Sequence, residues 1–113
     1  MPTEAAIQAA IVAALTADGV YVVRVARASR VGVADLLCCA AGRFLALEVK
    51  APGAGLRPAQ VYEAGRVTAA GGVAAVVRSV AEARAAIREH TTRCRGVPRQ
   101  LPQVSPQHWR QRE

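Results

Sequence analysis

Four charged residues interrupt the apolar segment 34–50, which reads ADLLCCAAGRFLALEVK, and three of them stand near its two ends. Asp35 stands near its start, and Glu48 and Lys50 stand at its end. Two carboxylates that converge at the edge of an apolar sheet repel each other, and they are costly to desolvate unless a cation lies between them. Carboxylate oxygens are hard ligands of the kind that Mg²⁺ prefers, and a neighbouring ammonium could orient a water or stabilise charge on a phosphate. The residue types therefore favour metal-dependent chemistry on phosphate.

A β-hairpin would bring these charges together. Two apolar runs, residues 36–41 and 44–50, are separated by Gly42 and Arg43. Glycine at the first of two loop positions is typical of a type II′ turn, so we expect the runs to pair antiparallel.

This register sets the relative positions of the three charges. Asp35 should face Lys50, and Glu48 should lie diagonal to Asp35 on the same face of the sheet, roughly 7 to 8 Å away between backbones. Both carboxylates could then reach one ion. The alternative is a solvated polar face on which Asp35 and Lys50 form a cross-strand ion pair worth about 0.2 to 1 kcal/mol.

Hydrophobic periodicity and capping residues predict the remaining elements. Thr3 can cap the first helix, Pro58 suits the first turn of the second, and Ser79 with Glu82 forms a capping box at the start of the third. The expected helices are 4–17, 58–70 and 80–90, and the further strands are 20–26 and 73–78. With a core built mostly from Ala and Val, this order predicts a mixed α/β domain.

The chain is strongly basic, with 15 Lys and Arg against 8 Asp and Glu, and 14 of the 15 are Arg. The planar guanidinium group matches phosphate oxygens in a bidentate way, so this composition favours a nucleic acid or another phosphate-bearing partner. Arg27, Arg30 and Arg57 flank the charged segment and could bind backbone phosphates. The alternative is a set of solvated arginines that serve solubility.

A length of 113 residues predicts one domain, which we place at 1–90, followed by a basic, Pro- and Gln-rich tail at 91–113. Three cysteines without a Cys-x-x-Cys spacing predict neither a disulfide framework nor a zinc site. The sequence shows no signal-peptide pattern and no apolar stretch of membrane-spanning length, so we expect a cytoplasmic protein.

Three motifs resemble the PD-(D/E)XK nucleases, and specifically their VRR-NUC branch of virus-type replication and repair nucleases. They are GVADLL at 32–37, LEVK at 47–50 and LRPAQ at 56–60. Their order and spacing match the family over residues 4–60, and the resemblance extends more loosely over about four fifths of the chain. Ala34 departs from the family pattern, in which many members carry Pro before the Asp. That proline shapes the turn and supplies no ligand.

The resemblance implies a restriction-endonuclease-like core: a helix, a three-stranded antiparallel meander, a helix, a strand and a helix. It implies that Asp35 and Glu48 bind the metal directly, with the backbone carbonyl of Val49 as a third ligand. Lys50 would position or polarise the attacking water.

The resemblance also implies that Glu4 and Gln60 belong to the catalytic set, with Glu4 often at longer range. Each residue has a local explanation as well. An acidic residue is favoured in the first turn of a helix by the macrodipole, and Gln60 could be an ordinary exposed helix residue.

As activity, the resemblance implies an Mg²⁺-dependent deoxyribonuclease, with Mn²⁺ as a substitute, that cuts branched DNA such as four-way junctions or flaps in phage or bacterial replication, recombination or repair. A homodimer would suit a four-way junction, because paired cuts need two sites related by symmetry. We expect no membrane partner. Two alternatives stay open: a basic nucleic-acid-binding module with a non-catalytic site, and a nuclease subunit that is active only in a larger complex.

Overall fold

Helices and strands alternate along residues 2–92, which the computed structural model describes. The elements follow the predicted order of a helix, three strands, a helix, a strand and a helix, which confirms the expected fold class. The helices are α1 (Glu4–Ala17), α2 (Pro58–Ala69) and α3 (Val80–Thr92), and the strands are β1 (Tyr21–Arg24), β2 (Leu36–Ala40), β3 (Arg43–Val49) and β4 (Val73–Val77).

The four strands form one sheet in the order β1-β2-β3-β4. β1, β2 and β3 make the antiparallel meander that the resemblance implied, and β4 pairs parallel to β3. α2 lies in the connection between β3 and β4, because parallel neighbours need a crossover. β3 is therefore paired along both edges, and it carries the first three residues of the LEVK motif through the interior of the sheet.

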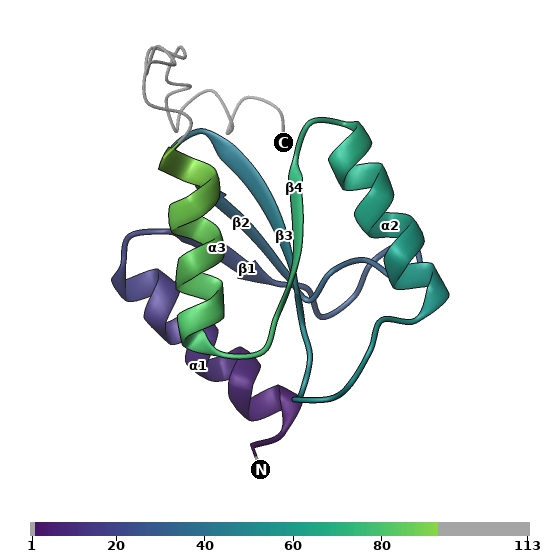
Figure 1. Ribbon diagram of the computed structural model, residues 1–113, viewed down its shortest axis with the longest axis horizontal. Coiled ribbons are helices and arrows are strands. Elements are labelled where there is room, and N and C mark those ends of the chain that lie inside the picture. Colours follow the sequence, from purple (N-terminus) through teal and green to yellow (C-terminus); the bar gives the residue numbers. More distant parts are fainter. Residues whose placement is uncertain (1, 93–113) are drawn as a thin grey trace, which may run out of the picture.

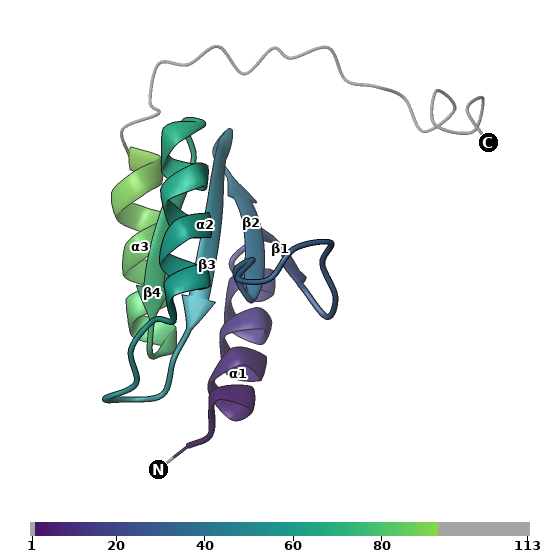
Figure 2. The same ribbon diagram turned by 90° about the vertical axis from the view of Figure 1, so that its right-hand side faces the viewer.

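Helices cover both faces of the sheet (Figure 1). α1 and α3 pack on one face, and α2 lies on the other. Figure 2 shows α2 in front of β3 and β4, with β1 and β2 to its side. The two faces are therefore covered unequally, by two helices on one side and one on the other.

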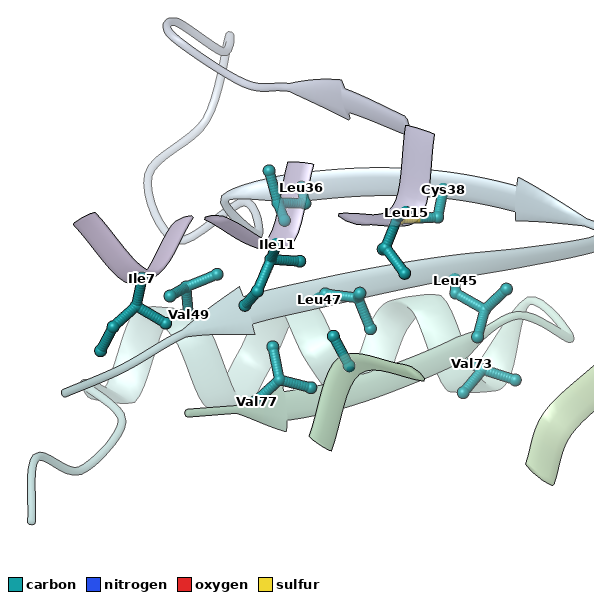
Figure 3. Packing of buried hydrophobic residues seen from close by; sticks show 11 residues of the cluster. Ile7, Ile11, Leu15, Leu36, Cys38, Leu45, Leu47, Val49, Val73 and Val77 are labelled. Carbon is teal, nitrogen blue, oxygen red and sulfur yellow. The ribbon is translucent and has the colours of Figure 1, made fainter. Parts of the chain in front are cut away.

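The main core lies between the sheet and the α1/α3 layer (Figure 3). Ile7, Ile11 and Leu15 are spaced four apart on α1, so they form one stripe that packs against apolar side chains of β2, β3 and β4. α2 contributes no large apolar side chain to this core. Its buried residues are the polar Gln60 and Glu63.

The helices begin at the predicted capping residues. Thr3 Oγ1 accepts the N–H of Ala6 at 3.1 Å, and Ser79 Oγ accepts the N–H of Glu82 at 3.1 Å. The Glu82 carboxylate reaches the N–H of Arg78 at 3.2 Å, one residue before the Ser79 amide that a regular capping box would use. The start of α3 is still stabilised by two side chains, because Ser79 and Glu82 each accept a backbone N–H.

The turn between β2 and β3 differs from the predicted one. Ala40 pairs with Arg43, so the two loop residues are Ala41 and Gly42 rather than Gly42 and Arg43. Both loop residues have a positive φ, 50° and 77°, which is the pattern of a type I′ turn. The prediction of a type II′ turn is therefore wrong. The sequence allowed both turns, because glycine fits the second loop position of a type I′ turn as well as the first loop position of a type II′ turn.

The register of the hairpin is shifted by two residues from the predicted register. Leu36 pairs with Leu47, and one further step places Asp35 opposite Glu48. The predicted pairing of Asp35 with Lys50 is therefore wrong. Because the shift is an even number, each side chain stays on its predicted face, and the two carboxylates come closer together.

β1 and α3 differ from the predicted elements by two residues at one end. β1 covers residues 21–24 rather than 20–26, and α3 continues to Thr92, so the expected domain boundary at residue 90 falls inside a helix. Residues 93–113 of the expected tail lie outside the described residues. None of the helices within 2–92 has both the length and the apolar character that crossing a membrane requires.

Candidate active site

The hairpin brings Asp35, Glu48 and Lys50 to one end of the sheet. Asp35 directly precedes β2, Glu48 lies near the end of β3, and Lys50 directly follows β3. They line a pocket of about 180 Å³ that also reaches α1 and α2. The site residues in its lining are Glu4, Gly32, Asp35, Glu48, Lys50, Arg57 and Gln60. The structure thus gathers all five residues that the sequence placed in the catalytic set.

Asp35 is fixed by backbone contacts on both sides. Its carboxylate oxygen Oδ2 accepts the N–H of Val49 at 3.0 Å, and its carbonyl oxygen accepts the N–H of Val25 at 2.8 Å. The first bond ties the carboxylate to β3, and the second ties the backbone to the chain that leaves β1. Asp35 therefore continues the sheet beyond β2, with its side chain beside Glu48.

Glu48 is a buried carboxylate, with 8% of its surface exposed. Its Oε1 accepts a hydrogen bond from Gln60 Nε2 at 2.8 Å and lies 4.0 Å from Lys50 Nζ. Its Oε2 is buried and has no hydrogen-bond partner among residues 2–92. Burial, followed by the charge of Asp35 and by a hydrogen bond that only protonated Glu48 can donate to the Asp35 side chain, raises the pKa of Glu48 from 4.5 to about 7, although Lys50 acts in the opposite direction. The ionised pair is therefore unfavourable unless a cation balances it.

Gln60 links this carboxylate to the start of α2. Its Oε1 accepts the backbone N–H of Arg57 at 2.8 Å, while its Nε2 donates to Glu48. The first bond satisfies one of the amides that a helix leaves free at its start. One side chain thus closes the helix end and orients Glu48.

Lys50 is the single lysine of the chain, and it is 7% exposed. Its N–H donates to the carbonyl oxygen of Val77 at 3.1 Å, so backbone pairing with β4 continues past the end of β3. The loop that follows is held by Arg78, whose Nη1 donates to the carbonyl oxygens of Ala51 and Ala54 at 2.8 and 2.7 Å. No local pattern around Arg78 signals this contact, because its partners come from another part of the chain.

Glu4 and Arg57 lie at the exposed rim of the pocket. Glu4 does not complete a cluster of three carboxylates, since no group of three or more acidic, His or Cys side chains suited to a metal occurs within the described part of the chain. Arg57 lines the same pocket as Lys50. Arg27 is exposed and lies outside the lining of the pocket.

Arg30 is paired with Glu63, a residue that the motifs did not include. Arg30 Nε donates to Glu63 Oε1 at 2.8 Å, and Glu63 is 6% exposed. This bond joins the connection between β1 and β2 to α2. One signal for Glu63 is its place three residues after Gln60, because residues three apart share one face of a helix.

Gly32 lets the same connection approach α2 closely. Its φ is 93°, and a Cβ at this position would lie 2.3 Å from the carbonyl oxygen of Ala59. The positive φ and the close contact both exclude a larger residue unless the backbone shifts. The segment that leads into Asp35 therefore lies against the helix that carries Gln60.

The whole arrangement has a counterpart among solved structures. The chain is similar to a structure described as a VRR_NUC domain, with a TM-score of 0.66 and 25% sequence identity, and the match covers 79% of this chain and 99% of that chain. No protein-family model matches the sequence, and no curated protein does. The structural match confirms the resemblance read from the motifs and supports a nuclease domain of the PD-(D/E)XK type.

Replacing Gly32 by Ala should lower stability more than the same change at Gly53. Gly53 also has a positive φ, 84°, but a Cβ there would meet no atom within 4 Å. Gly53→Ala should therefore lower the free energy of unfolding by about 1 kcal/mol through backbone strain alone. Gly32→Ala adds the clash with Ala59 and should lower it by about 3 kcal/mol. Urea unfolding measures both, and equal losses would show that the segment does not lie against α2 at Gly32.

Without a divalent ion, the free energy of unfolding should fall as the pH rises from 4.5 to about 7. In this range Glu48 keeps its proton in the folded chain and loses it in the unfolded chain, because folding raises its pKa. Above pH 7 Glu48 is ionised in the folded chain as well, and this deficit in the free energy of unfolding reaches its full size of about 3 kcal/mol. Glu48→Gln removes this deficit. In a chelator, the variant should be more stable than the natural chain at pH 8 and close to it at pH 5.

Glu89→Gln is the matched control for this measurement, because it removes one carboxylate from an exposed position of α3. Urea unfolding at the two pH values provides the comparison. Added Mg²⁺ should reverse the order at pH 8, since it stabilises only a chain that binds it. A difference between Glu48→Gln and the natural chain that does not change with pH would contradict the raised pKa.

Proposed function

Starting from a nuclease domain of the PD-(D/E)XK type, we propose that this chain is a metal-dependent DNA endonuclease that hydrolyses phosphodiester bonds. The observation that carries the proposal is the group formed by Asp35, Glu48 and Lys50 in one pocket at the end of β3. Buried charges are costly to hold, so they favour a functional explanation. The chain uses Arg at all 14 of its other basic positions, and its one compact ammonium group lies here.

The donor set fits a hard divalent cation. Glu48 Oε2 is buried without a hydrogen-bond partner among the residues described, and the Asp35 carboxylate lies beside Glu48. Mg²⁺ keeps several waters and commonly takes one or two carboxylates plus phosphate oxygens, which agrees with a site of two carboxylates. Asp35, Glu48 and the backbone carbonyl of Val49 would hold the ion, and Mn²⁺ would substitute for Mg²⁺.

The residues of the chain have distinct roles around such an ion. When bound, the ion supplies charge that polarises the scissile phosphate and stabilises the leaving oxygen. Lys50 Nζ orients and polarises the attacking water. Gln60 is a positioning residue, because its 2.8 Å hydrogen bond holds Glu48. Glu4 acts at longer range from the rim, and Arg57 binds a neighbouring backbone phosphate.

Branched DNA is the substrate that we propose, with four-way junctions and flaps ahead of plain duplex. The net charge of +7 supports binding to phosphates independently of sequence. Arg27 would add a phosphate contact outside the pocket. Two chains related by twofold symmetry would present two sites to the two strands of a junction, so the proposal includes a homodimer. The products would carry 5′ phosphates.

Cleavage of end-labelled substrates tests the proposal. We expect cutting of a four-way junction or a flap with Mg²⁺ or Mn²⁺ and none in a chelator. Glu48→Ala and Lys50→Ala should each lower the rate at least about a hundredfold, since each removes a group that acts on the reacting atoms. Lys50→Arg should lose nearly as much although it keeps the charge, because the guanidinium is larger and planar.

Glu89→Gln, which lies on the exposed side of α3, is the control and should cut as the natural chain does. Binding without cutting on junction, flap, single-strand and duplex DNA, with either metal, would contradict the proposal. That outcome would favour the non-catalytic binding module or a subunit that needs a partner. Cutting that survives both Glu48→Ala and Lys50→Ala would place the catalytic centre elsewhere.

A further inference from the structure

A second cavity adjoins the catalytic pocket on the α2 side of the sheet. Its volume is about 340 Å³, against about 180 Å³ for the catalytic pocket. Gly32, Val33, Glu48 and Gln60 line both spaces, so the two share a wall. A ligand held in the catalytic pocket could therefore extend into the larger cavity.

Apolar side chains form opposite walls of this cavity. Those of the strands and of α2 include Phe44, Ala46, Ala74, Val76, Ala64 and Val67. Because α2 faces the sheet with small or branched side chains, helix and sheet leave space between them. The Phe44 side of the cavity is open to solvent, since this residue is 45% exposed. Such walls suit a flat, largely apolar body.

In this apolar cavity Glu63 supplies an oxygen atom that accepts no hydrogen bond. It lines the cavity, and its Oε1 is already bonded to Arg30. Its Oε2 is buried and has no hydrogen-bond partner within residues 2–92, although it forms an ion pair with Arg66 Nη1 at 3.7 Å, beyond hydrogen-bond length. An N–H group that entered the cavity would satisfy this oxygen.

We propose that the cavity receives one unpaired nucleobase of the DNA substrate, whose amino group donates to Glu63 Oε2. The inference rests on the proposed nuclease function, because the base would enter beside a phosphate held near Glu48. A nucleobase has a flat body that packs between apolar side chains, and an N–H edge that a carboxylate can read. A flap offers unpaired bases, whereas a four-way junction or an intact duplex must first give up stacking and pairing. Binding of a base in the cavity therefore favours cleavage of the strand next to a branch point.

Glu63 also makes the cavity selective among bases. An ionised carboxylate only accepts hydrogen bonds, and cytosine, adenine and guanine each carry an amino group that donates one. Thymine and uracil carry a carbonyl oxygen where cytosine has its amino group. Deoxycytidine and deoxyuridine are nearly equal in size, so a comparison of the two isolates this hydrogen bond.

Flap substrates with deoxycytidine, deoxyuridine or an abasic residue at the unpaired position next to the cut provide the test. With Mg²⁺, the deoxycytidine flap should be cut on the order of tenfold faster than the deoxyuridine flap, and the abasic flap should be cut most slowly. Binding to Lys50→Ala should follow the same order without any cutting. Glu63→Gln should abolish or reverse the preference, because Gln still accepts from Arg30 and turns a donor toward the base.

Ala64→Leu tests the cavity independently of hydrogen bonding, because the larger side chain fills it. The variant should unfold at a temperature close to that of the natural chain, and it should bind the deoxycytidine flap on the order of tenfold more weakly. Ala69→Leu, at an exposed position of α2, is the matched control and should bind as the natural chain does. Free deoxycytidine monophosphate should compete only weakly, since the proposed ligand is a base within a strand.

Three results would contradict the proposal that the cavity binds an unpaired base. The first is equal cutting of the three flaps with no effect of Ala64→Leu, which would leave the nuclease function intact. The second is tight binding of the free nucleotide that Ala64→Leu abolishes while flap binding is unchanged. The third is self-association that Ala64→Leu abolishes, which would assign the cavity to a second copy of the chain. A base preference in binding without cutting of any substrate would instead support the pocket and count against the nuclease.

Discussion

Repulsion between two carboxylates at the end of one hairpin is the constraint around which this molecule is organised. The register of β2 and β3 places Asp35 opposite Glu48, and the burial of Glu48 removes the water that would screen the two charges. Burial, followed by the charge of Asp35, raises the pKa of Glu48 to about 7. Apolar residues at such positions would often serve stability better, so the pair favours the cation site proposed above.

The contacts around this pair also determine how α2 is attached to the sheet. Gln60 ties Glu48 to the start of α2, and the bond between Arg30 and Glu63 ties the segment before Asp35 to the next turn of the same helix. α2 buries these polar side chains rather than an apolar stripe. These polar contacts attach the start of the helix, and an apolar cavity lies beside them.

Local signals in the sequence predict most of the fold, because capping residues and apolar periodicity act over a few neighbouring positions. The hairpin register could not be predicted in this way, since Gly42 fits two kinds of turn and only the pairing of whole strands decides between them. Asp35 and Glu48 still share one face of the sheet despite this error, because a two-residue shift keeps every side chain on its face. The pairing of Arg30 with Glu63 joins positions 33 residues apart, and the space that Gly32 needs is set by Ala59, so neither could be read from local pattern.

Binding of Mn²⁺, followed by electron paramagnetic resonance of the free ion, measures most directly whether the carboxylate pair is a metal site. At pH 8 the natural chain should bind Mn²⁺, as should the control Glu89→Gln. Asp35→Asn and Glu48→Gln should each bind the ion at least about a hundredfold more weakly, because each removes a direct ligand from a set that depends on few protein oxygens. Equal affinity of Mn²⁺ for the natural chain and for Glu48→Gln would contradict the account.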